Sequence, residues 1–116
     1  MKTLNYIFLI FLIGSITSAC AQNKEVTITT HKLTENIYML EGQGGNIGIS
    51  VGNDGVFMID SQFAPLTPKI FEAIKKLSTK PIKFLANTHH HGDHTGGNEN
   101  ISKLNTPIIA HDNVYK

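Results

Sequence analysis

Residues 89–94 hold four histidines and one aspartate within six positions, a composition suited to binding metal ions. Because side chains at positions i and i+2 of an extended chain lie on one face, we expect His89 and His91 to point together and chelate one ion. His90 is expected to point away from them, either toward solvent or toward a group that supports a ligand. The spacing thus predicts a two-histidine chelate at the end of a strand.

The second half of the cluster predicts a second ion. Gly92 allows the backbone to turn tightly, so that Asp93 and His94 can present an oxygen and a nitrogen to a neighbouring point. Paired catalytic metals typically lie about 3.5–4 Å apart. The cluster is internal and precedes a glycine pair at 96–97, which favours a structured site over an affinity tag or a sequestering tract. The sequence therefore predicts a binuclear centre with zinc as the expected metal, and the ligand types leave iron or manganese open.

Short runs of β-branched and apolar residues predict the strands that position this cluster. The Asn-Asp-Gly segment at 53–55 predicts a hairpin in which Val51 faces Val56. Residues 56–59 are expected to form a largely buried strand that delivers Asp60 at its end. Strands are expected at residues 26–30, 37–40, 46–51, 56–59, 82–87 and 107–110.

One amphipathic helix is expected between these strands. Thr67 can cap it with Pro68 in its first turn, apolar residues recur at helical spacing over 70–77, and Lys75 and Lys76 face water. The order of strands, helix and strand implies an α/β layering. Further expected helical features are a second helix from residue 97 or 98 that carries Ile101 and Leu104, and a helix start at Asp112.

Residues 1–21 are typical of a secretory signal peptide. Lys2 gives a positive start, and residues 6–13 form an apolar run shorter than the roughly 20 residues of a membrane span. Cleavage before Gln22 would release a soluble periplasmic protein, whereas cleavage before Cys20 would leave a lipidated cysteine that anchors the protein to the membrane. Soluble export is favoured and lipid anchoring stays open. Because Cys20 is the one cysteine, the folded part must bind metals through histidine and carboxylate.

The composition is that of a globular protein. Of 116 residues, 41% are apolar and 16% charged, and the formal net charge is +1. The sequence contains no basic run or stripe, so no nucleic-acid partner is expected. One domain or part of one is expected, and nothing in the sequence indicates an oligomeric state.

The segment 88–97, Thr-His-His-His-Gly-Asp-His-Thr-Gly-Gly, resembles the HxHxDH motif of the metallo-β-lactamase superfamily. That family's fold begins with a β-meander, and an aspartate at the end of an early strand supports its metal-binding loop. Asp60 occupies the matching place. The resemblance implies that residues 22–116 are the truncated N-terminal part of a metallo-β-lactamase-like domain, the first half of an αββα sandwich.

The resemblance also implies a role for each residue of the cluster. His89 and His91 would hold the first metal, and Asp93 and His94 the second. Asp93 would in addition act in catalysis by orienting the nucleophile, while Asp60 would hydrogen-bond a ligand rather than bind metal. Metal ions lower the pKa of bound water to about 7, so that hydroxide is available at neutral pH to attack a carbonyl.

Within the resemblance, His94 stands where one lactamase subclass has arginine, and His91 stands where di-iron oxidoreductases commonly have glutamate. Export argues against thioesterases and nucleases that work inside the cell. We therefore expect an exported zinc hydrolase of a small molecule, either a β-lactam or a similar amide, lactone or ester. The alternative is a non-catalytic metal-binding remnant, because the family's remaining ligands lie downstream of this motif. On that basis we expect weak zinc binding, little turnover and one uncovered apolar face.

Overall fold

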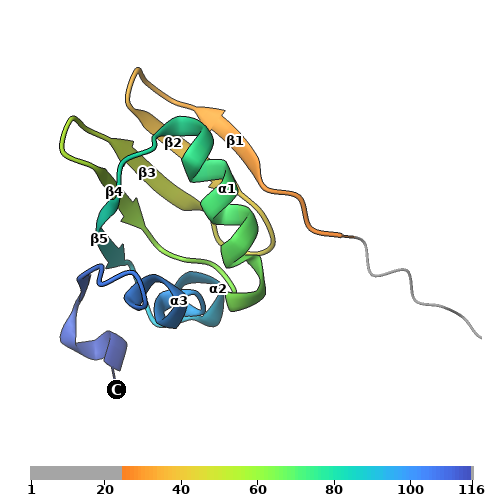
Figure 1. The fold of residues 1–116 in the computed structure, drawn as a ribbon. Coiled ribbons are helices and arrows are strands. Elements are labelled where there is room, and N and C mark those ends of the chain that lie inside the picture. The colour runs from red at the N-terminus through yellow and green to blue at the C-terminus, as the bar shows by residue number, and fades with distance from the viewer. Residues whose placement is uncertain (1–24, 116) are drawn as a thin grey trace, which may run out of the picture.

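A six-stranded mixed sheet with helices packed on one face forms the protein, in a computed structural model that describes residues 25–115. The expected signal peptide, with its two cleavage sites at Cys20 and Gln22, lies outside the described residues. Figure 1 shows the green helix lying in front of the strands and the blue helices below it in the view. The elements are β1 (Thr29–Lys32), β2 (Ile37–Glu41), β3 (Ile47–Val51), β4 (Val56–Ile59), η1 (Ala64–Leu66), α1 (Thr67–Leu77), β5 (Ile82–Asn87), α2 (Gly92–Thr95), α3 (Asn98–Ser102), β6 (Ile108–Ala110) and η2 (Asp112–Tyr115).

The first four strands form an antiparallel meander. Val51 pairs with Val56, and the Gly52 amide donates to the Gly55 carbonyl at 2.8 Å, so the hairpin predicted from the Asn-Asp-Gly segment is confirmed. Gly55 has a φ of 152°, a conformation that favours glycine. The first strand was predicted three residues too early, since β1 begins at Thr29 rather than at residue 26.

The last three strands are parallel and place the candidate site. β4 pairs with β5, β5 pairs with β6, and Ile59 stands beside Ala86 near the ends of their strands. The carboxyl ends of parallel strands meet at one edge of a sheet, which is where open α/β proteins usually bind ligands. Asp60 follows β4 and Thr88 follows β5, so the two residues lie close together at that edge.

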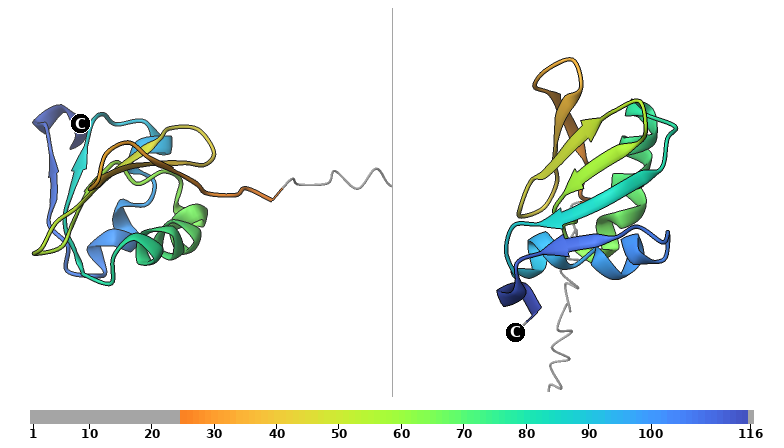
Figure 2. Two further views of the ribbon diagram at one scale, coloured as in Figure 1. Left: turned by 90° about the horizontal axis from the view of Figure 1, so that it is seen from above. Right: turned by 90° about the vertical axis from the view of Figure 1, so that its left-hand side faces the viewer.

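Helix α1 covers one face of the sheet with its apolar side. Ile70 and Ile74 are buried, while Lys75 and Lys76 are exposed as predicted. Figure 2 shows α1 and α3 on the same side of the sheet. The core between these layers consists of Leu40, Ile47, Ile49, Val56, Met58, Leu66, Ile70, Ala73, Ile74, Leu85 and Ile101.

The predicted start of α1 was wrong in detail. Leu66 occupies the cap position, and no side chain caps the helix. The Thr67 hydroxyl instead accepts a hydrogen bond from Asn100 Nδ2 at 3.1 Å, which joins the first turn of α1 to α3. Pro68 does lie in the first turn, where a missing amide hydrogen costs nothing.

The second face of the sheet presents apolar side chains to solvent. Strand β4 was expected to be largely buried, but its side chains alternate: Val56 and Met58 have no exposed surface, whereas Phe57 is 37% and Ile59 is 39% exposed. Phe57 pairs with Phe84, and Ile109 pairs with Ala86, so these residues share the face opposite α1. The uncovered apolar face that we expected is therefore present in the described residues.

The two ends of the described chain adjoin β1 and β6. Lys69 of α1 donates to Glu25 Oε1 at 2.8 Å; this hydrogen bond and the lysine charge lower the pKa of Glu25 from its ordinary 4.5. Toward the other end, the predicted second helix is shorter than expected: α3 ends at Ser102, and Leu104 lies after it and is 52% exposed. Asp112 begins the short η2.

No helix within residues 25–115 is long and apolar enough to cross a membrane.

Candidate metal centre

The histidine cluster begins where β5 ends. The strand stops at Asn87, and Thr88 to His90 form a bend, so the extended geometry assumed for the cluster was wrong. The Thr88 amide donates to Asp60 Oδ1 at 2.8 Å, which takes it out of the sheet ladder. The rings of His89 and His91 nevertheless lie near each other, with centroids 4.7 Å apart at an interplanar angle of 70°.

The aspartate and last histidine of the cluster lie on α2. His91 caps this helix, accepting from the Thr95 amide at 3.0 Å, and Asp93 and His94 follow in its single turn. Gly92 does not make the tight turn expected of it. It begins the helix without a positive φ, and a side-chain carbon there would meet only the Phe63 ring, at 3.8 Å.

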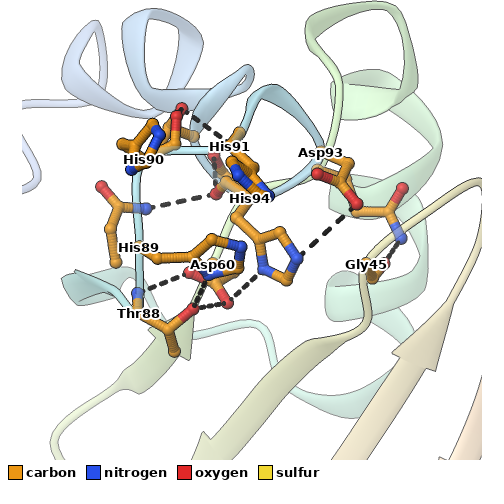
Figure 3. A network of polar contacts seen from close by, with 12 residues as sticks. Gly45, Asp60, Thr88, His89, His90, His91, Asp93 and His94 are labelled. Atoms are coloured by element: carbon orange, nitrogen blue, oxygen red, sulfur yellow. Dashed lines mark hydrogen bonds and ion pairs between the residues drawn. The ribbon is translucent and has the colours of Figure 1, made fainter. Parts of the chain in front are cut away.

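Asp60 is the central acceptor of the site. It is 3% exposed and has a φ of 63°, which is uncommon outside glycine. Its Oδ1 accepts from the Thr88 amide at 2.8 Å, and its Oδ2 lies 2.7 Å from both the Thr88 hydroxyl and His94 Nδ1. Figure 3 shows these contacts converging on one carboxylate. The structure thus joins Asp60 to His94, one of the predicted ligands.

The contact with Asp60 orients the His94 ring. A carboxylate only accepts hydrogen bonds, so Nδ1 of His94 carries a proton, and in the neutral ring Nε2 presents its lone pair. That Nε2 faces Asp93 Oδ2 at 3.6 Å, as Figure 3 shows. A histidine whose Nδ1 is held by a carboxylate is the usual arrangement for a metal ligand bound through Nε2.

Thr88 extends the same orientation to His89. Its hydroxyl has one hydrogen, which it donates to Asp60 Oδ2, so toward His89 Nδ1, at 3.0 Å, it can only accept. His89 Nδ1 therefore carries the proton, and His89 Nε2 is free as well. One buried carboxylate fixes the tautomers of two predicted ligands, one directly and one through a hydroxyl.

The cluster is less divided than expected. The ring centroids of His89 and His94 are 4.0 Å apart, a shorter separation than that between His89 and His91, so the two predicted pairs adjoin each other. His90 is exposed as expected, although its ring also lies 4.8 Å from that of His91.

The donors fit zinc in kind but do not form a complete shell. Imidazole nitrogens and a carboxylate oxygen are zinc ligands, and Nε2 of His89 and of His94 are both free to bind. Within residues 25–115, however, no three histidine, cysteine, aspartate or glutamate side chains are grouped so that they could hold one ion. The assignment of His89, His91, Asp93 and His94 as ligands therefore stays a prediction.

A second polar network holds the backbone of His94. Its carbonyl accepts from the Ser61 amide at 2.8 Å and from Asn87 Nδ2 at 3.2 Å, and the Ser61 hydroxyl oxygen lies 3.2 Å from it. Asn98 completes the network, since its Nδ2 donates to Asn87 Oδ1 at 2.6 Å and its Oδ1 accepts from the Ser61 hydroxyl at 2.8 Å. Sequence reasoning missed these residues. Their one signal was position, because Asn87 ends an expected strand, Ser61 lies just after another, and Asn98 lies at the expected start of a helix.

The loop before β3 lies against the same site. A side-chain carbon on Gly45 would be 2.6 Å from His94 Nε2, and one on Gly44 would be 2.8 Å from Asp93 Cβ. The Gln62 side-chain amide donates to the Gly45 carbonyl. The backbone of this glycine loop therefore packs directly on Asp93 and His94.

The sequence and the fold both match known proteins. The pattern of the metallo-beta-lactamase superfamily matches residues 36–115, and the chain belongs to that superfamily, whose members are generally hydrolases. Among solved structures, the fold is similar to the metallo-beta-lactamase FIM-1 of Pseudomonas aeruginosa in its mono-zinc form, with a TM-score of 0.69 and 25% identity. It is also similar to BJP-1, a subclass B3 metallo-beta-lactamase of Bradyrhizobium japonicum, with a TM-score of 0.62 and 29% identity.

These matches cover most of this chain and a minor part of the relatives. The chain spans 45% of FIM-1 and 32% of BJP-1, with 79% and 71% of its own residues covered. An alkyl/aryl-sulfatase of Saccharomyces cerevisiae, BDS1, is 34% identical over a 77-residue alignment that covers 62% of this chain and 12% of the yeast protein. The family and the fold are thus established, and the α/β fold class predicted from the sequence is confirmed.

Proposed function

We propose that the chain carries the metal-binding half of an exported zinc-dependent hydrolase that acts on a β-lactam or on a similar small amide, lactone or ester. The observation that carries this proposal is the buried Asp60 carboxylate, which contacts His94 directly and His89 through Thr88. Histidines that bind zinc through one ring nitrogen typically hydrogen-bond a carboxylate or another acceptor through the other ring nitrogen. The likeness to FIM-1 in a mono-zinc form and to BJP-1 supports zinc and β-lactams as the first candidates.

In this proposal His89 and His91 hold one zinc ion, and Asp93 and His94 hold a second. Zinc bound there would supply a Lewis acid and lower the pKa of a bound water to about 7. The chain's own residues do the positioning. Asp60 keeps both Nδ1 protons in place, and Asp93, whose side chain is 30% exposed, accepts a hydrogen bond from the attacking water through a carboxylate oxygen.

Export is proposed from the leader alone. Residues 1–21 have the charge, apolar run and small residues of a signal peptide, and Cys20 offers the alternative of a lipid anchor. Radioactive palmitate labelling that is lost in Cys20→Ala, together with sensitivity of processing to globomycin, supports the anchored form. Unlabelled protein in the periplasmic fraction supports soluble export.

A second candidate reaction is the hydrolysis of alkyl or aryl sulfate esters. The yeast sulfatase supports it, since its 34% identity to this chain exceeds that of the two lactamases. Both reactions use an activated water on a small anionic or polar substrate, and the residues described here serve either one. Direct assay distinguishes the two reactions.

The proposal is tested with the protein expressed from its native gene and supplied with Zn²⁺. The substrates are nitrocefin, an acyl homoserine lactone and p-nitrophenyl sulfate. We expect hydrolysis of one of these substrates that is abolished by chelators and by His89→Ala. The control is His31→Ala, which changes a partly exposed histidine of β1 paired with Glu41 of β2 and should leave hydrolysis intact. Zinc binding without hydrolysis of any substrate would instead support the non-catalytic metal-binding alternative.

A further inference from the structure

Gln62 is a buried polar residue beside the predicted metal site, and it lies outside the histidine motif. It is 0% exposed, its φ is 56°, and its Oε1 has no hydrogen-bond partner among the described residues. A positive φ outside glycine and an unpaired buried acceptor are each unfavourable. Their coincidence in one residue calls for a compensating contact.

That contact is made by the other end of the side-chain amide. Gln62 Nε2 donates to the carbonyl of Gly45, while the Gln62 carbonyl accepts from the Gly97 amide at 2.8 Å. Gln62 thus links the glycine loop before β3 to the turn before α3. The loop packs on the side chains of Asp93 and His94, and the turn follows these two residues in the chain.

The tethered loop has no spare room over the site. A side-chain carbon on Gly45 would lie 2.6 Å from His94 Nε2, and one on Gly44 would lie 2.8 Å from Asp93 Cβ. Contacts this short mean that backbone alone fits against the two side chains. The position of the loop therefore decides how much space is open above His94 Nε2 and Asp93 Oδ2.

We propose that Gln62 is a positioning residue whose side-chain amide ties the Gly44–Gly45 backbone onto Asp93 and His94 and sets the width of the opening above them. The proposal rests on the function proposed for that site. Without the tether the loop lifts from the His94 ring, while the core beneath Gln62 stays packed.

Gln62→Met tests this inference, because methionine keeps the volume and removes both polar atoms. In the metal-free protein we expect amide exchange of residues 43–46 to rise about tenfold, with exchange in the 52–55 hairpin unchanged. The side-chain ¹⁵N signals of His94 are expected to shift as Gly45 leaves the ring. Gln43→Met is the matched control, since it alters an exposed glutamine of the same loop and should change neither signal.

Three results would overturn the inference: unchanged exchange at 43–46, an equal increase throughout the core, or the same effect in Gln43→Met. If Gln62→Met does not fold, the tether is tested in the unaltered protein. We expect slowly exchanging Gln62 Nε2 protons with nuclear Overhauser contacts to Gly45, and their absence would contradict the tether. Because all these measurements are made without metal, a missing tether and a failure to bind zinc are separate outcomes.

Discussion

His94 Nδ1 lies 2.7 Å from Asp60 Oδ2, and this contact turns the opposite ring nitrogen toward Asp93. The two residues are 34 positions apart in sequence and meet because β4 and β5 are adjacent parallel strands. A carboxylate that follows one strand therefore reaches a histidine in the loop that follows the next strand. The orientation of a predicted metal ligand is fixed by the sheet itself.

Asp60→Asn should disturb the orientation of the His94 and His89 rings while keeping the shape of the side chain. The amide keeps the shape but has one acceptor oxygen in place of two, so it cannot serve the Thr88 amide, the Thr88 hydroxyl and His94 together. We expect zinc affinity, measured by competition with a chromophoric chelator, to fall about 10–100-fold. Asp54→Asn in the exposed hairpin is the control, and an equal loss there would show that charge alone is responsible.

Thr88→Val should release His89 while leaving His94 held. Valine keeps the branched shape and the backbone amide that donates to Asp60, but it removes the hydroxyl between Asp60 and His89. Side-chain ¹⁵N shifts should then report mixed tautomers for His89 and an unchanged Nδ1–H tautomer for His94. Thr79→Val, at an exposed position, should alter neither ring. An unchanged His89 would show that Thr88 does not act as the link.

Gly97→Ala should disturb the site by a direct clash. The added carbon would lie 2.5 Å from the Ser61 carbonyl, and backbone there must shift. We expect a loss of about 1–3 kcal/mol in the free energy of unfolding, measured with urea. Gly92→Ala is the matched variant, because its added carbon has room and sits in helix α2. Equal losses in the two variants would contradict the packing described for Gly97.

The two faces of the sheet should respond differently to truncation of a side chain. Met58→Ala opens a cavity under α1 and should lower the free energy of unfolding by about 2–5 kcal/mol. Phe84→Ala, on the neighbouring strand and the solvent-facing side of the sheet, removes a side chain that is 45% exposed and should cost clearly less. Binding of an apolar fluorescent dye should fall in Phe84→Ala alone. A larger loss of stability in Phe84→Ala would mean that the outer face is covered in solution.

The local features of this fold could be read from the sequence, because neighbouring residues determine them. The 51–56 hairpin, β5 and the placement of Asp60 after β4 follow from turn residues and apolar alternation. The HxHxDH pattern likewise marks the cluster without reference to the strands around it.

Features that depend on distant partners could not be read in this way. Thr67 accepts a hydrogen bond from Asn100, 33 positions away, instead of capping its own helix. The bend at His89 follows the hydrogen bond that the Thr88 amide donates to Asp60. The contact of Gln62 with Gly45 likewise needs the packed sheet, because the loop at 42–45 has no local signal for its position. The alternation of buried and exposed side chains in β4 depends on which face of the sheet α1 covers. Hydrophobic periodicity alone does not give that face.

The most direct test of the account is a zinc titration of the protein followed by side-chain ¹⁵N signals of its six histidines. We predict that Nε2 of His89 and of His94 and one ring nitrogen of His91 shift on adding Zn²⁺, with affinity weak for the chain alone, and that His31 and His111 are unaffected. The signals should return on adding chelator. Equal shifts at His31 and His111, or none at His89 and His94, would contradict the metal centre proposed here, and tight stoichiometric binding of two ions by this chain would contradict its incomplete shell.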